Sequence, residues 1–371
     1  MRILQVLPAL HSGGVERGTI EFARELVARG HDSWVMSSGG RLSENLAATG
    51  SRHIRFPVHR KSLRSLLAVR ALRRQLIELA PDVVHVRSRV PAWMVYLALR
   101  PLPANQRPAV VSTFHGLYST NAYSAIMGRA DRVIAISRCV RDYILSNYPK
   151  VPEERITVVP RGVDTRAFHG GMRAGPDWIE ALCAAHPGLD PTLPWIMMPG
   201  RLSRWKGQAT FIRLIAGLRA RGVPCQGLIV GEAEAGKEAY AKELQQQVAR
   251  EQLQASVFFL GHRSDMATLY ATCQLVCNLS SRPEPFGRTV IEALACGTPV
   301  LAWDQGGPAE SLRDCLPEGL VMPGDEVALL ATAQRLLSDR SLEFQLPDCY
   351  TLGAQADATL AVYEQALADR G

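Results

Sequence analysis

The chain alternates between short apolar runs and longer segments in which apolar side chains recur at helical spacing. In the first half the apolar runs cover residues 2–7, 33–37, 82–86, 109–113, 132–136 and 156–159. Runs of this kind, bounded by turn residues, predict buried strands. Residues 15–29 place Ile20, Ala23 and Val27 on one face and stop at Gly30, which predicts a helix. Strands that alternate with helices are typical of a parallel α/β layer.

A second set of strands and helices follows with the same alternation. Its strands are predicted at residues 195–198, 227–230, 257–260, 275–279, 300–303 and 319–321, with helices at 209–219 and 288–296. Residues 165–190, which contain a Gly-Gly pair, Pro176 and Pro187, read as the link between the two sets. We therefore expect an α/β protein with Rossmann-like domains at 1–170 and 171–350, and a C-terminal helix within 351–371.

Length and composition agree with this division into domains. A chain of 371 residues exceeds what one hydrophobic core usually holds, and its 47% hydrophobic and 21% charged residues are ordinary for a globular protein. The longest apolar run, residues 90–99, falls short of the ~18 residues of a membrane span. Residues 1–7 predict a first strand rather than a signal peptide. With eight scattered cysteines, we expect a protein of the reducing cytoplasm.

The charge is distributed unevenly along the chain. Residues 1–170 contain 25 Lys and Arg against 12 Asp and Glu, a net charge of +13, whereas residues 171–371 carry −6. The densest part, residues 52–74, interleaves basic and apolar side chains and reads in part as a basic amphipathic helix. Two interpretations remain open for it: a solvated helix face, or a contact with an anionic inner-membrane surface. No nucleic-acid-binding motif accompanies the charge.

Two carboxylates stand out in residues 283–300, PEPFGRTVIEALACGTPV. The prolines and Gly287 disfavour a helix before Arg288, and Gly297 and Pro299 stop one after it. Glu284 is therefore expected on the loop at the N-terminus of a helix, and Glu292 inside that helix. A helix N-terminus offers free N–H groups to an anion, and carboxylates accept hydrogen bonds from sugar hydroxyls. On its own, such a pair is as well explained by surface charges.

A basic loop, Pro199-Gly-Arg-Leu-Ser-Arg-Trp-Lys-Gly207, follows the strand at 195–198. Ligands of open α/β sheets bind at the carboxyl ends of the strands, and Arg201 and Lys206 there can pair with a diphosphate. Gly200 permits close backbone approach. The chain contains no Asp-x-Asp, so we expect fixed cations rather than a metal to stabilise a departing phosphate, and we expect no cofactor.

These motifs resemble the E-x7-E and G-R-L-x-x-x-K-G signatures of retaining glycosyltransferases of family 4, including those of the bacterial envelope. The resemblance implies a GT-B fold, two Rossmann-like doubly wound domains facing a cleft, with a C-terminal helix that crosses back to the first domain. It implies that Glu284 contacts the donor sugar and that Glu292 contacts the ribose. It also implies that Arg201 and Lys206 stabilise the leaving nucleoside diphosphate, with Phe286, Gly287 and Arg288 beside the donor.

Three further segments match the same family. His11-Ser-Gly-Gly-Val15 resembles its Gly-Gly loop, which places Gly14 near the donor diphosphate and Gly13 near the acceptor. His115, just after the strand at 109–113, matches the family's active-site histidine. Arg161-Gly-Val-Asp164 resembles an N-G-V-D segment, but Arg replaces Asn, which leaves an acceptor or phosphate contact open. Arg87 and Arg89, at the end of a strand, are candidates for an anionic acceptor or for a helix surface.

We therefore expect a metal-independent hexosyltransferase that uses a nucleotide-diphosphate sugar, with UDP favoured, and retains the anomeric configuration. The expected acceptor is an anionic saccharide or glycolipid of the cell envelope, such as lipopolysaccharide core or a lipid-linked glycan. Two alternatives remain: a sugar-nucleotide epimerase of the same fold, and a catalytically silent sugar-nucleotide-binding protein. Gly231-Glu-Ala-Glu-Ala-Gly-Lys237 fits a phosphate-binding loop only superficially, because Glu238 occupies the position of the Mg²⁺-binding Ser or Thr.

Overall fold

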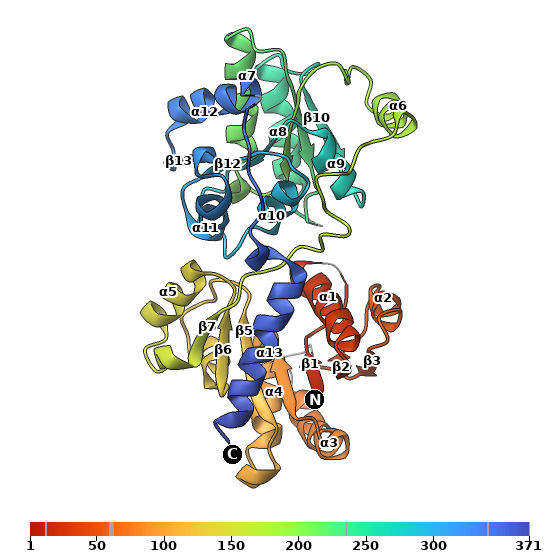
Figure 1. Cartoon of the computed structure of the whole chain (residues 1–371), viewed down its shortest axis with the longest axis vertical. Coiled ribbons are helices and arrows are strands. Elements are labelled where there is room, and N and C mark those ends of the chain that lie inside the picture. Colours follow the sequence, from red (N-terminus) through yellow and green to blue (C-terminus); the bar gives the residue numbers. More distant parts are fainter. Residues whose placement is uncertain (12, 59–62, 235, 340, 371) are drawn as a thin grey trace. The chain divides into compact units, whose positions relative to one another are not determined.

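The protein is described by a computed structural model that covers residues 1–11, 13–58, 63–234, 236–339 and 341–370. The chain divides into two units, each considered by itself (Figure 1). The first unit comprises Met1–Gly162 and Thr351–Gly371, and the second comprises Val163–Tyr350. The sequence predicted the boundary between the domains at residue 170, whereas in the structure residues 163–170 belong to the second unit.

The first unit is built on a seven-stranded parallel sheet with the order β3-β2-β1-β4-β5-β6-β7. The inner strand β1 pairs with β2 on one side and with β4 on the other, so the strand order reverses there as in doubly wound folds. The strands are β1 (Arg2–Val6), β2 (Asp32–Ser37), β3 (Arg52–Arg55), β4 (Val83–Val86), β5 (Ala109–Phe114), β6 (Arg132–Ala135) and β7 (Ile156–Val158).

Helices cover this sheet, and its inner strands are consequently largely buried. All four residues of β4 are buried, which is why the run reads as continuous rather than alternating. The helical segments of the unit are α1 (Gly14–Ala28), α2 (Ser43–Ala47), α3 (Leu63–Leu79), α4 (Arg89–Leu99), η1 (Ala104–Gln106), η2 (Ser124–Arg129), α5 (Arg138–Asn147), η3 (Glu153–Arg155) and α13 (Leu352–Ala368).

The second unit repeats this design around a six-stranded parallel sheet with the order β10-β9-β8-β11-β12-β13. Its strands are β8 (Trp195–Pro199), β9 (Gln226–Val230), β10 (Val257–Gly261), β11 (Leu275–Asn278), β12 (Val300–Trp303) and β13 (Leu320–Val321). Its helical segments are α6 (Pro176–Ala185), η4 (Arg204–Lys206), α7 (Gln208–Ala220), α8 (Glu238–Arg250), α9 (Met266–Thr272), α10 (Arg288–Ala295), α11 (Gly306–Cys315), η5 (Pro317–Gly319), α12 (Glu326–Ser338) and η6 (Asp348–Tyr350).

Successive residues of the second sheet enter two separate cores. Ile196 packs in one cluster with Phe211 of α7, whereas its neighbour Met197 packs in the other with Val290 of α10. Side chains that alternate along a strand point to opposite faces of the sheet. The sheet is therefore covered on both faces, and only the loops at its ends remain to form sites.

Part of the basic segment 52–74 is helical, as the sequence predicts, because α3 begins at Leu63; residues 52–55 form strand β3, and residues 59–62 lie outside the described part. The interpretation of 165–190 as a linker needs correction, because α6 begins at Pro176. Proline is well accepted at the first position of a helix, where its missing N–H breaks no hydrogen bond.

The C-terminal helix α13 is an integral part of the first unit, beside β5, β6 and α1 (Figure 1). Its Tyr363 is fully buried, and the ring lies 6.1 Å from that of Phe22 and 5.6 Å from that of His85. The Tyr363 hydroxyl lies 2.6 Å from His85 Nδ1, while His85 Nε2 lies 2.6 Å from Thr113 Oγ1. Tyr363 thus links α13 to β4 and β5 by both packing and hydrogen bonding.

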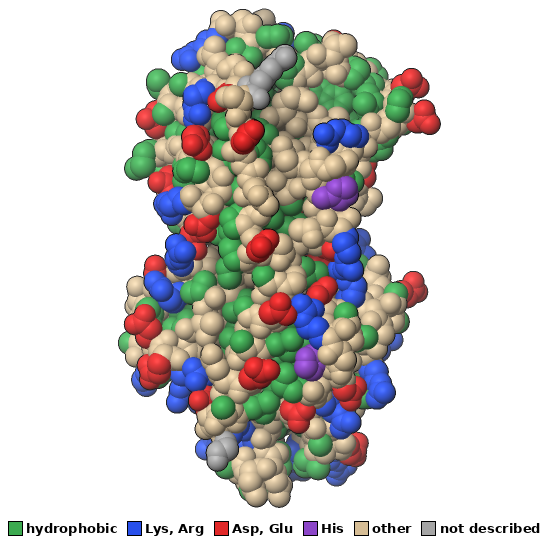
Figure 2. Space-filling model, viewed as in Figure 1, with side chains coloured by type: hydrophobic (Ala, Val, Ile, Leu, Met, Phe, Trp, Pro, Cys, Tyr) green, Lys and Arg blue, Asp and Glu red, His purple; other side chains and the backbone are tan. Residues whose placement is uncertain are grey.

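Among the described residues, no helix combines the length and apolar character that a membrane crossing requires. On the face drawn in Figure 2, basic and acidic side chains are interspersed over both units. The excess positive charge of residues 1–170 therefore does not form one continuous patch on that face.

Replacing Tyr363 with alanine should lower the free energy of unfolding of the full chain by about 3–5 kcal/mol, because the change leaves a cavity and removes a buried hydrogen-bond partner. The matched control is Gln365→Ala on the exposed side of the same helix, which should change it by no more than about 0.5 kcal/mol. Urea denaturation followed by circular dichroism measures both. A loss below about 1 kcal/mol for Tyr363→Ala would contradict the packing described for α13.

Candidate functional site

Glu284 lies on a tightly built loop between β11 and α10. Gly287 forms the N-cap of α10 with a φ of 84°, a left-handed conformation that favours glycine. The Gly307 N–H donates to the Glu284 carbonyl at 2.9 Å, so the start of α11 holds the loop from behind. A Cβ on Gly306 would lie 2.6 Å from that same carbonyl oxygen. The loop and the two helix starts therefore fix the position of the Glu284 side chain.

The Glu284 carboxylate is buried and contacts a cation. Its Oε1 lies 2.8 Å from Lys206 Nζ and also accepts a hydrogen bond from the Ser280 hydroxyl. Lys206 lies above the ring of Trp205, with Nζ 4.5 Å from the centroid. Removing both charges from water is costly, so the pair depends on good geometry and on these added contacts. An anionic ligand could take over Lys206 and leave the carboxylate to accept hydrogen bonds.

Glu292 is also buried, although a solvated helix charge was an equally simple interpretation of the sequence. On α10 its Oε1 lies 3.4 Å from Arg288 Nε, and its Oε2 accepts a hydrogen bond from the Tyr270 hydroxyl at 3.3 Å. Burial and the nearby Glu292 charge raise the pKa of Tyr270 well above its usual value, so the phenol keeps its proton and donates. A buried carboxylate held in this way can accept further hydrogen bonds from hydroxyls.

Arg201 belongs to a neighbouring loop and has a different counter-ion. The Gly200 N–H donates to the Val230 carbonyl at 2.8 Å, which ties the loop after β8 to the loop after β9. A Cβ on Gly231 would lie 2.1 Å from the Gly200 carbonyl oxygen, so only glycine permits this approach. Arg201 is exposed and forms an ion pair with Glu234, which also binds Lys237. The structure thus places Lys206, but not Arg201, against Glu284.

The candidate residues of the first unit begin with the Gly-Gly loop. Gly13 is the N-cap of α1 with a φ of 150°, and its carbonyl accepts from the Arg17 N–H at 3.1 Å. Gly14 is the first helical residue, and both glycines are exposed. The loop directly follows the central strand β1 and Leu7, so it lies where open α/β sheets bind ligands.

His115 and Arg161 lie together at the carboxyl ends of β5 and β7. Arg161 Nη2 donates to His115 Nδ1 at 2.6 Å, which leaves the proton of the neutral ring on Nε2. His115 Nε2 is enclosed and has no hydrogen-bond partner among the described residues. Burial, together with the charges of Arg161 and Arg87, lowers the pKa of His115 well below its ordinary value. The ring is therefore neutral and holds one oriented N–H donor for which a ligand oxygen is the natural partner.

Arg87 and Arg89 differ in their surroundings. Arg87 is buried, with Nη1 donating to Gln5 Oε1 at 2.8 Å and to Thr19 Oγ1 at 3.0 Å, and burial lowers its pKa to about 10. It therefore acts from within the core, as a charge behind His115. Arg89 is partly exposed, donates to Ser124 Oγ at 3.2 Å and lies 4.8 Å from the Tyr118 ring centroid.

Several residues that position the candidate site were not predicted from the sequence. Ser280, Trp205 and Tyr270 position the two carboxylates and Lys206, and Glu234 holds Arg201. Tyr270 and Glu234 lie far along the chain from Glu292 and Arg201, so the sequence does not indicate these contacts. Trp205 adjoins Lys206 and Ser280 lies four residues before Glu284, but neither forms part of a recognised motif. Among the described residues, no group of three or more His, Cys, Asp and Glu is placed to hold a metal ion.

Comparison with known proteins covers both units. The model of Glycosyltransferase Family 4 matches residues 12–167, and the model of Glycosyl transferases group 1 matches residues 185–347. The chain is 30% identical over 221 residues to the lipopolysaccharide core biosynthesis mannosyltransferase LpsB of Rhizobium meliloti (strain 1021), which covers 58% of this chain and 58% of LpsB. The chain thus spans less than two thirds of that relative's length.

Solved structures match over nearly the full length. A glycosyltransferase from Rickettsia africae ESF-5 is similar with a TM-score of 0.85 and 28% identity, covering 99% of this chain and 98% of that chain. HepE of Anabaena, in complex with UDP, is similar with a TM-score of 0.76 and 25% identity, covering 98% of both chains. The parallel sheets and their order are those of the GT-B fold, which these similarities support.

Gly287→Ala should lower the free energy of unfolding of the second unit by more than the cost of placing an alanine in a left-handed conformation. A left-handed residue other than glycine costs about 1–2 kcal/mol, and here the new Cβ would also lie 2.6 Å from Pro308 Cγ. Gly324→Ala is the matched control, because Gly324 has a φ of 86° and open space around it. In chemical denaturation we expect Gly287→Ala to lose about 1–3 kcal/mol more free energy of unfolding than Gly324→Ala. Equal losses of stability in the two variants would contradict this prediction, because the loop would then move away from the new Cβ at no cost in free energy.

The neutral His115 should make stability fall on acidification. Its folded-state pKa lies below the unfolded value near 6.5, so below that pH the unfolded chain binds more protons and the free energy of unfolding decreases. His115→Gln should therefore reduce the loss between pH 7 and pH 5.5, by at most about 1.4 kcal/mol per pH unit. The exposed His11, replaced by Gln, serves as control. An unchanged slope in His115→Gln would contradict the assignment of a neutral ring.

Proposed function

The chain belongs to glycosyltransferase family 4, and on this basis we propose that it transfers a hexosyl unit from a nucleotide-diphosphate sugar to a saccharide acceptor, with retention of anomeric configuration. The observation that carries the proposal is the ion pair between the partly buried Lys206 and the buried Glu284 at the N-terminus of α10. A diphosphate needs a cation, and a sugar needs hydrogen-bond acceptors. The pair supplies both groups side by side.

The roles of the donor residues follow from these contacts. The diphosphate would take Lys206 from Glu284 and Arg201 from Glu234, so each cation exchanges a carboxylate partner for a phosphate. Glu284, held by Ser280, would then accept from the sugar hydroxyls, and Glu292 would accept from the ribose. The amides of Phe286, Gly287 and Arg288 at the helix start, with those of Gly200 and Gly14, would approach the donor.

The chemistry would be transfer on one face of the sugar. None of the described side chains is an evident covalent nucleophile, so the leaving phosphate would take the proton of the attacking acceptor hydroxyl as the new glycosidic bond forms. Arg201 and Lys206 would stabilise the charge that develops on the diphosphate, which makes a metal ion unnecessary in this proposal. His115 would donate its Nε2–H to a hydroxyl of the transferred sugar.

UDP is the nucleotide that we propose. The support comes from HepE of Anabaena, whose structures are described as complexes with UDP and, in one case, with UDP and glucose. An epimerase of the same fold is the alternative reaction, and it would change the sugar of the nucleotide sugar without an acceptor. A silent binding protein would hold the donor and release no nucleotide.

For the acceptor we propose an anionic saccharide or glycolipid of the cell envelope, such as lipopolysaccharide core, as the name of LpsB suggests for that relative. Gly13, Arg89 and Arg161 are the candidate contacts, whereas the buried Arg87 would act only through its charge. We also propose that basic residues within 52–74 contact an anionic membrane surface, on the cytoplasmic face of the inner membrane. Arg52 and Arg55 are exposed on β3, and Arg70 and Arg74 are exposed on α3.

A thermal-shift panel tests the donor site. UDP, GDP, ADP and CDP with their sugars should be compared on the wild type, on Glu292→Ala and on Glu318→Ala, an exposed control in the same unit. A ligand at a hundred times its dissociation constant stabilises by about 2.7 kcal/mol. We expect the nucleotides of one base to raise the melting temperature of the wild type and of Glu318→Ala, and this rise to be lost in Glu292→Ala. No shift with any nucleotide would contradict the proposal.

A further inference from the structure

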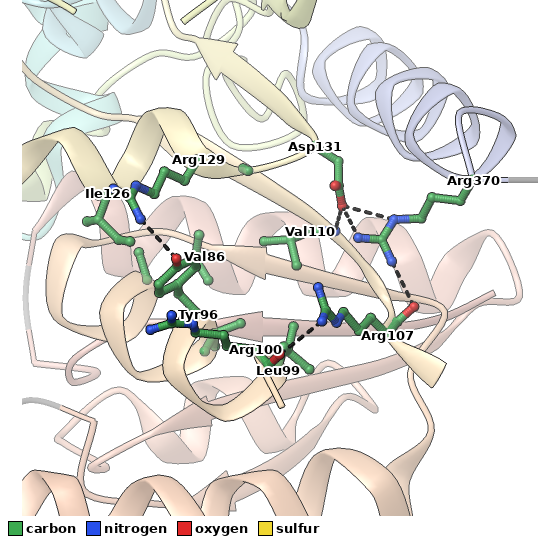
Figure 3. A pocket seen from close by; sticks show the side chains of 13 residues that line it. Val86, Tyr96, Leu99, Arg100, Arg107, Val110, Ile126, Arg129, Asp131 and Arg370 are labelled. Carbon is green, nitrogen blue, oxygen red and sulfur yellow. Dashed lines mark hydrogen bonds and ion pairs between the residues drawn. The ribbon is translucent and has the colours of Figure 1, made fainter. Parts of the chain in front are cut away.

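The first unit contains a cavity of about 210 Å³ whose lining residues do not include Arg87, Arg89, His115 or Arg161 (Figure 3). It lies between α4, η2 and the start of β5, and its walls include Val86, Val95, Leu99, Val110 and Ile126. Val110 and His115 are five residues apart along β5 and its exit, which corresponds to about 17 Å of extended chain. The cavity is therefore not a part of the site that holds His115.

Four arginines surround these apolar walls: Arg100, Arg107, Arg129 and Arg370. Arg370 is neutralised, because Asp131 Oδ2 lies 2.6 Å from its Nη2 and is held in turn by the Val110 N–H at 2.7 Å. The other three have no carboxylate within ion-pair distance among the described residues. The cavity thus combines an apolar interior with three uncompensated positive charges.

Neutral oxygens position two of these three cations. Arg107 donates to the carbonyls of Leu102 at 2.8 Å and Arg100 at 2.9 Å, and Arg129 donates to the Tyr96 hydroxyl at 2.9 Å. The Arg129 guanidinium also lies 5.2 Å from the Tyr96 ring centroid. The side chain of Arg100, at the C-cap of α4, makes no hydrogen bond to a described residue. Arg107 and Arg129 are therefore held by neutral groups at the edge of the cavity, and all three exposed arginines keep their charge available.

We propose that this cavity binds a single-chain amphiphile with an anionic head group. The apolar chain enters between α4 and β5, and its phosphate or carboxylate lies against Arg100, Arg107 and Arg129. The volume corresponds to roughly seven waters and is smaller than the 300–1,000 Å³ of typical drug-sized sites, so it suits one alkyl chain rather than a ring system. Opposite charge on the head group offsets the mutual repulsion of the three arginines.

Alkyl phosphates below their micellar concentration test the proposal by isothermal titration calorimetry on the full chain. Affinity should rise from hexyl to octyl to decyl phosphate, by up to roughly fourfold per methylene until the cavity is filled. Inorganic phosphate and decyltrimethylammonium should not bind measurably. Equal binding of the cationic amphiphile, or binding that does not depend on chain length, would overturn the proposal as mere surface adsorption.

Two variants assign the binding to this cavity. Arg100→Gln should weaken decyl phosphate by about two- to fivefold, as for an exposed ion pair, and reduce the salt dependence of binding. Arg250→Gln, which removes one exposed charge from α8 of the other unit, should leave the affinity unchanged. Ala92→Met, which fills the cavity from the α4 side, should abolish binding with the fold intact by circular dichroism. Unaltered affinity in both Arg100→Gln and Ala92→Met would overturn the assignment.

A parallel experiment with lipid vesicles distinguishes a membrane lipid from a free amphiphile as the ligand. Sedimentation with phosphatidylglycerol vesicles that depends on Arg100 and Ala92 in the same way would identify a membrane lipid as the occupant. Binding of monomeric decyl phosphate without such sedimentation would identify a free amphiphile. Sedimentation that both variants leave unchanged, with no binding of decyl phosphate, would refute the cavity as a lipid site.

Discussion

The ion pair between Lys206 and Glu284 is the constraint around which the second unit's site is built. Two opposite charges 2.8 Å apart, with Glu284 buried and Lys206 partly buried, require a scaffold that holds them in place. The left-handed Gly287, the hydrogen bond from Gly307 to the Glu284 carbonyl, and the Ser280 hydroxyl supply that scaffold. The side chains are thus already organised, and in the proposed function an anion would need only to replace one partner of Lys206.

In the first unit, too, charged neighbours fix the state of a candidate residue, and there both neighbours are arginines. Burial, together with the charges of Arg161 and Arg87, lowers the pKa of His115 and keeps the ring neutral, and the contact from Arg161 fixes which ring nitrogen carries the proton. Neither feature requires flexible loops, because the residues follow β4, β5 and β7 of one parallel sheet. Tyr363 of α13 packs against the same strands through His85 and Thr113, so the end of the chain supports the strand that carries His115.

The sequence was sufficient for most of the strands and for the placement of Glu284 on a loop and Glu292 in a helix, because buried parallel strands and glycine-bounded helices leave strong local patterns. It failed at β3, whose Arg-His-Ile-Arg segment is a half-exposed edge strand without an apolar run. It also left Arg87 undecided, because burial of a charged side chain depends on Gln5 and Thr19, distant in sequence. The partners Glu234 for Arg201 and Ser280 for Glu284 are likewise set by the fold alone.

Titration of UDP without a sugar into the wild type, Lys206→Met and Glu284→Gln tests the central claim most directly. If an anion displaces the carboxylate from Lys206, Lys206→Met should weaken UDP by about tenfold or more, as for loss of a charged hydrogen bond. Glu284→Gln should bind UDP as tightly as the wild type or more tightly, because it removes the competitor and UDP has no sugar to contact. Equal weakening in both variants would contradict the account.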